Sequence, residues 1–193
     1  MIESMWLAPE QCAVVAAACD RLIPGSASAG VADYVDGLLD AFSADPPRIW
    51  AGGPFSGRHG GLADGERGFQ RFLELGPIEE LAWRTRIEGS RGIPEREFNG
   101  PVRGLQEEYA DGLAALGEDF ASATTSEQDQ RLDALPTFKA LLYRHACEGM
   151  YGDPVYGGNR DGAGWTAIGF AGDTQPRGWT DVEVRGPSSE NPA

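Results

Sequence analysis

Apolar residues recur along the chain at the three- and four-residue spacing that places them on one face of an α-helix. The clearest stripe spans residues 31–42, where apolar side chains follow Val31 at offsets of 3, 4, 7, 8 and 11. An earlier stripe spans residues 9–23, begins at a proline and is followed by Pro24-Gly25, a combination typical of helix starts and stops. These patterns predict the first two helices.

Helical patterning continues through the second half of the chain. Ser126 with Asp129 has the spacing of a capping box, which indicates a helix start there. No sustained apolar and polar alternation occurs before Tyr151, so strands are not predicted. We therefore expect an all-α fold of about six or seven helices with long Gly/Pro-rich loops in a single compact domain. The later helices are expected over residues 69–73, 78–88, 105–116, 126–135 and 136–146.

Two irregular segments stand out because the chain contains 27 glycines and 13 prolines. Residues 43–65 hold six glycines and three prolines, and residues 151–170 hold six further glycines. Connections of this length without periodicity are uncommon in compact domains and tend to be functional or bound to a partner. We expect the helical domain to span residues 5–180 and residues 181–193 to form a flexible tail.

The charge balance narrows the possible partners. Thirty acidic and sixteen basic residues give a formal net charge of −14, which disfavours nucleic acid and anionic lipid surfaces. The N-terminal sequence has no twin arginine and no long apolar run, and no stretch is long enough to insert in a membrane. We expect a cytoplasmic protein, periplasmic only if a partner carries it or a signal is missing. Cys12, Cys19 and Cys147 are expected to be buried thiols in a reducing compartment.

Few residues suggest chemistry in this chain itself. Residues 162–167 match the GxGxxA form of a dinucleotide fingerprint but lack the preceding strand that such a site needs. His145 and Glu148 share a helix face, so a stand-alone metal-dependent enzyme using these two residues and Asp153 is an alternative hypothesis. The other interpretation of His145 is a satisfied core histidine or a donor to a neighbouring carboxylate. The sequence predicts no catalytic, cofactor-binding or metal-binding residue.

The aromatic and arginine content of the two irregular segments favours a protein interface, because such side chains dominate binding energy at interfaces. The alternatives are that the rings pack back onto the helices as local core, or that they form a sugar-binding module. Asn159 and Arg160 are expected to satisfy polar groups either within the loop or across the interface. The predicted interface residues are Trp50, Phe55, Arg58, Tyr151, Tyr156, Asn159, Arg160, Trp165 and Phe170.

The same residues carry a family resemblance. EGMYGDP at 148–154, YGGNRDG at 156–162 and the following Trp165 resemble the C-terminal signature of the gluconate 2-dehydrogenase subunit 3 family. LAPEQ at 7–11 and DRLIP at 20–24 are similar to that family's N-terminal motif.

This resemblance implies a small subunit without chemistry of its own. It would stabilise or chaperone an FAD-dependent large subunit of the glucose-methanol-choline oxidoreductase class that oxidises a sugar, glycoside, polyol or sugar acid. The FAD would lie in the partner, and this chain would bind no cofactor.

Overall fold

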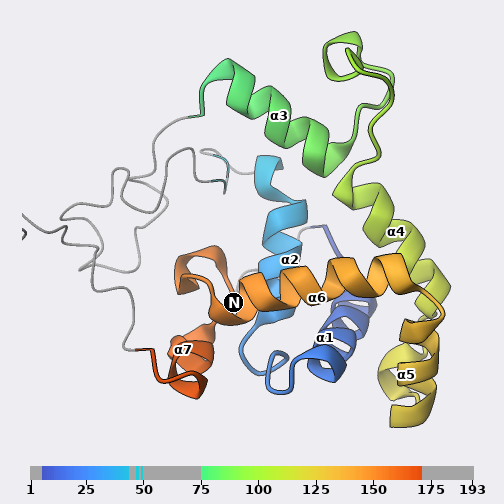
Figure 1. Ribbon diagram of the computed structural model, residues 1–193, viewed down its shortest axis with the longest axis vertical. Coiled ribbons are helices and arrows are strands. Elements are labelled where there is room, and N and C mark those ends of the chain that lie inside the picture. Colours follow the sequence, from blue (N-terminus) through green and yellow to red (C-terminus); the bar gives the residue numbers. More distant parts are fainter. Residues whose placement is uncertain (1–5, 44–46, 48, 50–74, 171–193) are drawn as a thin grey trace, which may run out of the picture.

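Figure 1 shows the computed structural model of the protein, which describes residues 6–43, 47, 49 and 75–170. Within these residues the chain forms helices, turns and loops without a β-strand, so the predicted all-α fold is confirmed. The predicted helix at 69–73 and the predicted tail at 181–193 lie outside the described residues. The α-helices of the described part are α1 (Pro9–Leu22), α2 (Val31–Leu39), α3 (Pro77–Glu88), α4 (Leu105–Leu116), α5 (Thr125–Asp133), α6 (Pro136–Tyr151) and α7 (Ala163–Ala167).

The centre of the fold is the packing of α6 against α1 and α2 (Figure 1). Val15, Val35 and Leu142, one from each of these helices, have no exposed surface. α5 packs beside α1 and α6, whereas α3 contacts α2 and α4 at the other end of the longest axis. No helix that the structure describes is both long and apolar enough to cross a membrane.

Most helix boundaries lie near the predicted positions, but α6 continues to Tyr151, past the predicted end at 146, and α7 lies in the segment predicted as irregular. α2 ends at Leu39 rather than at 42, and a 3₁₀ turn over Ala41–Ser43 follows it. The ring of Phe42 nevertheless packs, because the guanidinium of Arg84 lies 4.1 Å from its centroid in a cation-π contact. The apolar spacing therefore identified a packed residue beyond the true end of the helix.

The capping box of α5 was predicted at the wrong residues. The actual cap is Thr124, whose side chain accepts from the amide of Glu127 while the Glu127 carboxylate accepts from the Thr124 amide. Asp129 instead accepts a bidentate ion pair from Arg21 on α1, with the closest nitrogen and oxygen 2.8 Å apart. Asp129, whose spacing from Ser126 suggested a local cap, thus takes part in a contact with a helix far away in sequence.

The cysteines also depart from expectation. Cys19 is fully buried on α1, and burial together with the neighbouring Asp20 raises the pKa of its thiol to about 12. Cys12 and Cys147 are only partly buried, so the expectation of three buried thiols is wrong for these two. None of the three cysteines forms a disulfide.

A buried carboxylate fixes the first described residues to the core. Oδ1 of Asp36 on α2 accepts from the amide of Trp6 at 3.0 Å and from the amide of Leu7 at 2.7 Å. Asp36 is 3% exposed and Leu7 is 2% exposed. Because hydrogen bonds to a charged acceptor are stronger than neutral ones, this contact holds the chain where it enters α1.

Asp36→Ala should lower the free energy of unfolding by about 2–3 kcal/mol, because it leaves two amides without their acceptor. Asp36→Asn retains an oxygen acceptor at the same position and should lose less, about 1 kcal/mol. Urea denaturation of the three proteins tests this order. Equal stability of the wild type and the alanine variant would show that the contact contributes nothing.

Candidate protein-interaction site

The loop that carries the glycine-rich sequence closes the C-terminal end of α6. The last carbonyl groups of a helix lack partners within the helix and must be satisfied elsewhere. Here the indole Nε1 of Trp165 donates to the carbonyl of Tyr151, and Nδ2 of Asn159 donates to the carbonyl of Gly152, both at 2.8 Å. Side chains from the loop thus form a cap on α6.

Asn159 is the central residue of this cap. Its backbone lies in the left-handed region, with φ 46° and ψ 43°, a conformation that asparagine tolerates better than most residues. Its side-chain Oδ1 accepts from the amide of Gly164 at 2.8 Å, so one amide group bridges the end of α6 and the start of α7. The side chain has no exposed surface.

Two glycines allow the loop backbone to lie directly against α6. A Cβ atom at Gly158 would lie 2.2 Å from the carbonyl oxygen of Gly149, and one at Gly164 would lie 1.8 Å from that of Met150. Both obstacles are backbone atoms, which no side-chain rotation can relieve. These positions therefore require glycine for steric reasons, independently of any ligand.

The loop is also attached to α2. The amide of Arg160 donates to the carbonyl of Ala29 at 2.9 Å, and its guanidinium forms an ion pair with Asp33. This ion pair is half exposed and contributes little energy, but the backbone bond sets the path of the loop. The loop therefore spans the two central helices of the fold.

An exposed apolar edge lies beside this cap. Tyr151, Trp165, Ile168 and Phe170 form what we call the α7 edge. The rings of Trp165 and Phe170 meet edge to face with centroids 5.4 Å apart, while Ile168 is 61% exposed and Phe170 49% exposed. Tyr151 is also exposed, and Trp165 is partly buried. A cluster of this kind on a fixed loop has the composition of an interface core.

The predicted interface residues occupy different positions in the structure. The rings of Trp165 and Phe170 meet at the α7 edge, and the carbonyl of Tyr151 accepts from the Trp165 indole there. Arg160 is exposed beside α2. Tyr156 is partly buried in a 3₁₀ turn, Pro154–Tyr156. Trp50, Phe55 and Arg58 lie outside the described residues. Whether these residues form an interface remains a prediction.

The structure alters the predicted set of interface residues at two positions. Of the two roles expected for Asn159, the structure shows the one in which it satisfies polar groups within the loop. Because its side chain is fully buried, it presents no surface to a partner. Ile168 was missed, although its place one helical turn after Trp165 is a signal that could have identified it.

The glycines that match the dinucleotide fingerprint at residues 162–167 have a structural explanation. Gly162 adopts the left-handed conformation at φ 66° and immediately precedes α7, which is only five residues long. No strand leads into it in the described part of the chain, whereas the nucleotide fingerprint depends on a strand, a tight turn and a helix. The glycine pattern belongs to the cap of α6.

The alternative metal-dependent enzyme receives no support from the arrangement of its residues. His145 is fully buried, with Nδ1 2.8 Å from the hydroxyl of Tyr109, and the two rings are stacked. Glu148 accepts from the hydroxyl of Tyr34 at 2.8 Å. The residues that the structure describes contain no group of three or more histidine, cysteine or carboxylate side chains placed to hold a metal ion.

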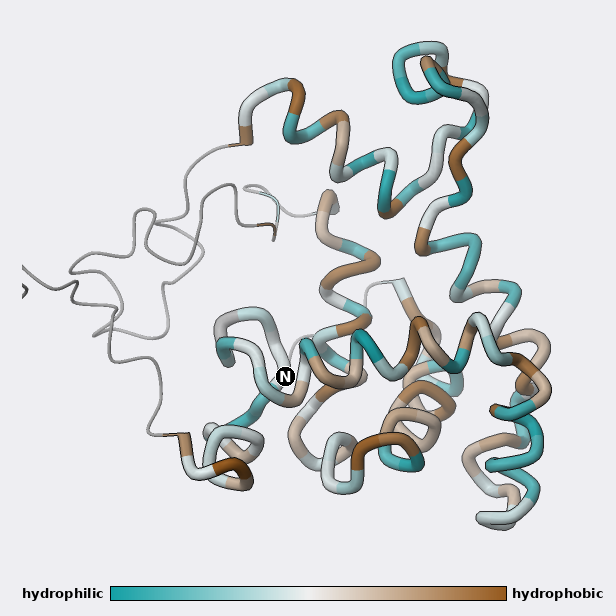
Figure 2. Tube along the Cα trace, in the orientation of Figure 1, coloured by the Kyte–Doolittle hydropathy of each residue, from teal (hydrophilic) through white to brown (hydrophobic). Residues whose placement is uncertain are grey.

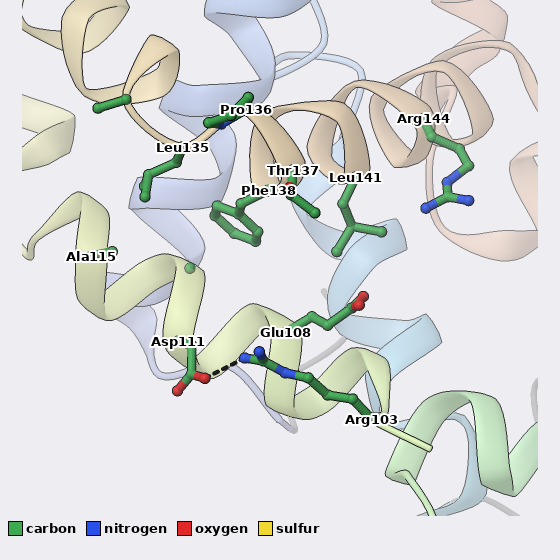
Figure 3. A pocket seen from close by; sticks show the side chains of 12 residues that line it. Arg103, Glu108, Asp111, Ala115, Leu135, Pro136, Thr137, Phe138, Leu141 and Arg144 are labelled. Atoms are coloured by element: carbon green, nitrogen blue, oxygen red, sulfur yellow. Dashed lines mark hydrogen bonds and ion pairs between the residues drawn. The ribbon is translucent and has the colours of Figure 1, made fainter. Parts of the chain in front are cut away.

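A separate open pocket of about 460 Å³ lies between α4 and the first half of α6 (Figure 3). Phe138 and Leu141 give it an apolar wall, and an ion pair between Arg103 and Asp111 lies on its α4 side. Gly112 permits this packing, because a Cβ there would come within 2.4 Å of the Phe138 ring. The lining contains neither histidine nor cysteine, and it shares no residue with the α6 cap.

These features define a small helical protein in which loop residues cap α6 and leave an apolar edge exposed. The family model for gluconate 2-dehydrogenase subunit 3 matches residues 9–172, and the chain belongs to this family. Family membership implies a subunit of a dehydrogenase complex. No curated protein matches the chain, and no solved structure matches it either.

Gly164→Ala should lower the free energy of unfolding by about 1–3 kcal/mol, because the new methyl group collides with the backbone of α6. Helix propensity alone would favour alanine by up to about 1 kcal/mol, so the sign of the change discriminates between the two effects. Thr166→Ala, an exposed change on the same helix, serves as the control in urea denaturation. A stabilised Gly164→Ala protein would contradict the close backbone contact.

The buried histidine should make stability depend on pH. Burial, reinforced by Arg144 and Arg86, lowers the pKa of His145 to about 4, below its value of about 6.5 in an unfolded chain. The unfolded state therefore binds more protons between these values, and the contribution of His145 to stability falls as pH falls.

Between about pH 7 and about pH 5 the loss due to His145 should reach about 2 kcal/mol. The measurement is the free energy of unfolding at both pH values for the wild type and for His145→Phe, which removes the titrating group. The difference between the two slopes isolates His145 from the carboxylates. Parallel slopes would show that the imidazole keeps an ordinary pKa.

Proposed function

We propose that this protein is the non-catalytic small subunit of an FAD-dependent oxidoreductase, and that it stabilises or chaperones the large subunit. The large subunit is of the glucose-methanol-choline class and oxidises a sugar, glycoside, polyol or sugar acid. The FAD belongs to that partner, and this chain contributes binding surface. Membership of a dehydrogenase subunit family supports the proposal.

The observation that carries the proposal is the structural role of the signature residues. Asn159, Gly158 and Gly164 fix a loop to α6, and none of them lines the pocket between α4 and α6. What the fixed loop leaves on the surface is the α7 edge. Preorganised aromatic and aliphatic side chains lose little entropy on binding, which makes them effective anchors for a partner.

We place the complex in the cytoplasm. The three cysteines form no disulfide, which suits a reducing compartment, where thiols persist. Cell fractionation with an antibody against the large subunit tests this assignment.

The interface is tested by co-expressing the chain with its FAD-binding large subunit and measuring complex yield and bound flavin. Ile168→Ser combined with Phe170→Ser should weaken the complex by about 2 kcal/mol or more, because both side chains are exposed and available to bind. Tyr143→Ala, a similarly exposed aromatic on α6 that is not part of the α7 edge, is the matched control. Circular dichroism of each isolated variant establishes that the helices remain folded.

A large subunit that is soluble, flavin-loaded and active without this chain would overturn the proposed function. Unchanged affinity of the double variant in a stable complex would instead move the interface away from the α7 edge.

A further inference from the structure

The pocket between α4 and α6 is a groove lined by one face of each helix, and we call it the α4–α6 groove (Figure 3). On α6 its lining extends from Pro136 to Arg144, a stretch of about 12 Å. At one end the loop over residues 89–104, which also exposes Phe98, enters α4, and Arg103 of this loop belongs to the lining. The groove therefore has the length of about four residues of an extended chain.

The middle of the groove is apolar. Phe138 and Leu141 form its α6 wall, and the exposed Ala115 belongs to its α4 wall. Figure 2 shows hydrophobic and hydrophilic positions alternating along α6, so this apolar wall has polar neighbours on the same helix. An apolar side chain that entered the groove would contact the α6 wall and could be blocked from the α4 wall.

Four charged side chains line the groove, and their charges balance. Arg103 and Asp111 form an ion pair with each other. Glu108 on α4 and Arg144 on α6 lie towards the same end of the groove (Figure 3), and neither makes a hydrogen bond or ion pair with a residue that the structure describes. The groove thus presents one unpaired group of each sign, on opposite walls.

Arg144 is unusual among the basic residues of the described part of the chain. All the others donate hydrogen bonds to oxygen atoms, except Arg86, whose guanidinium lies 5.5 Å from the centroid of the Trp83 ring. Arginine presents a planar fork of donors that matches a carboxylate. A free guanidinium beside an apolar wall therefore favours an acidic group next to an apolar one.

The open shape of the groove favours a protein segment over a free small molecule. Small-molecule sites generally bury about 70–90% of the ligand surface, whereas this groove is open to solvent. A segment of a larger partner is held by other contacts as well, so it does not need to be enclosed. Covering Glu108 and Arg144 without partners would leave desolvated charges, so the segment must bring a basic and an acidic group of its own.

We infer that the α4–α6 groove is a second docking site for the large subunit, and that it takes a short segment with an apolar side chain between an acidic and a basic group. The acidic group pairs with Arg144 and the basic group with Glu108, while the apolar side chain packs on the α6 wall. The identity of the partner rests on the proposed function.

The groove and the α7 edge are separate contacts on one helix. Pro136 at one end of the groove lies about 22 Å along α6 from Tyr151 at the α7 edge. A large subunit that contacted both would hold α6 at two separated points, and the second contact would then form at high effective concentration.

The steric test fills the groove from its exposed wall. Ala115→Tyr should weaken binding of the purified flavin-loaded large subunit at least about tenfold, because the new ring takes the place of the apolar side chain. Ala114→Tyr, at an exposed neighbour on α4 that does not line the groove, should leave the affinity unchanged. Biolayer interferometry measures both affinities, and circular dichroism establishes that both variants are folded.

A charge exchange separates pairing with the partner from pairing within this chain. Arg144→Glu should weaken binding at least about tenfold, and Arg91→Glu, the same change of charge outside the groove, should weaken it much less. Arg144→Glu combined with Glu108→Arg exchanges the two charges and should still bind weakly, because each then meets a like charge on the segment. Affinity restored by the exchange would show that the two residues pair with each other, and would overturn the inference.

Wild-type affinity of either Ala115→Tyr or Arg144→Glu would overturn this inference and leave the proposed function standing. So would an equal loss in Arg144→Glu and Arg91→Glu, which would reveal an effect of net charge alone. No binding by the wild type would overturn both proposals. Light scattering of the isolated chain tests the rival occupant, because a dimer that dissociates on Ala115→Tyr would assign the groove to a second copy of this chain.

Discussion

The close approach of the loop backbone to the end of α6 is the constraint on which the rest of this site depends. Gly158 and Gly164 lie so near the carbonyls of Gly149 and Met150 that any side chain would separate the two segments. Only at this distance can Asn159 bridge Gly152 and Gly164, and only then does the Trp165 indole reach Tyr151. The signature thus encodes a steric fit, and the α7 edge is its consequence.

The same geometry explains why the family resemblance touches both ends of the chain. Oδ1 of Asp20 accepts from the amides of Gly25 and Ala27 and shapes the turn after α1. The carbonyl of Ala29, at the end of that turn, accepts the amide of Arg160. The N-terminal motif and the C-terminal signature are therefore parts of one structure, although more than a hundred residues separate them.

Local patterns predicted the helices well because apolar periodicity records which face of each helix is buried. They failed where a residue's partner lies far away in sequence. Asp129 has the spacing of a cap residue, yet Arg21 on another helix binds it. The inward direction of Asn159 could not be read from the sequence either, since it depends on how α6 and α7 meet. Loop composition indicated an interface, but which side chains reach the surface follows only from the folded path.

The two projecting loops share one method of construction. In the loop of residues 89–104 the two end glycines lie in backbone contact, and in the loop after α6 Gly158 and Gly164 lie against α6 carbonyls. Each loop is braced by a buried polar residue, Ser90 in the first and Asn159 in the second. Each leaves aromatic surface exposed although the core does not need it. A flexible loop would lose conformational entropy on binding, and that cost would offset part of the contact energy. Bracing by hydrogen bonds and glycine contacts places this entropy loss in the folding step, so that more of the apolar contact energy remains for association.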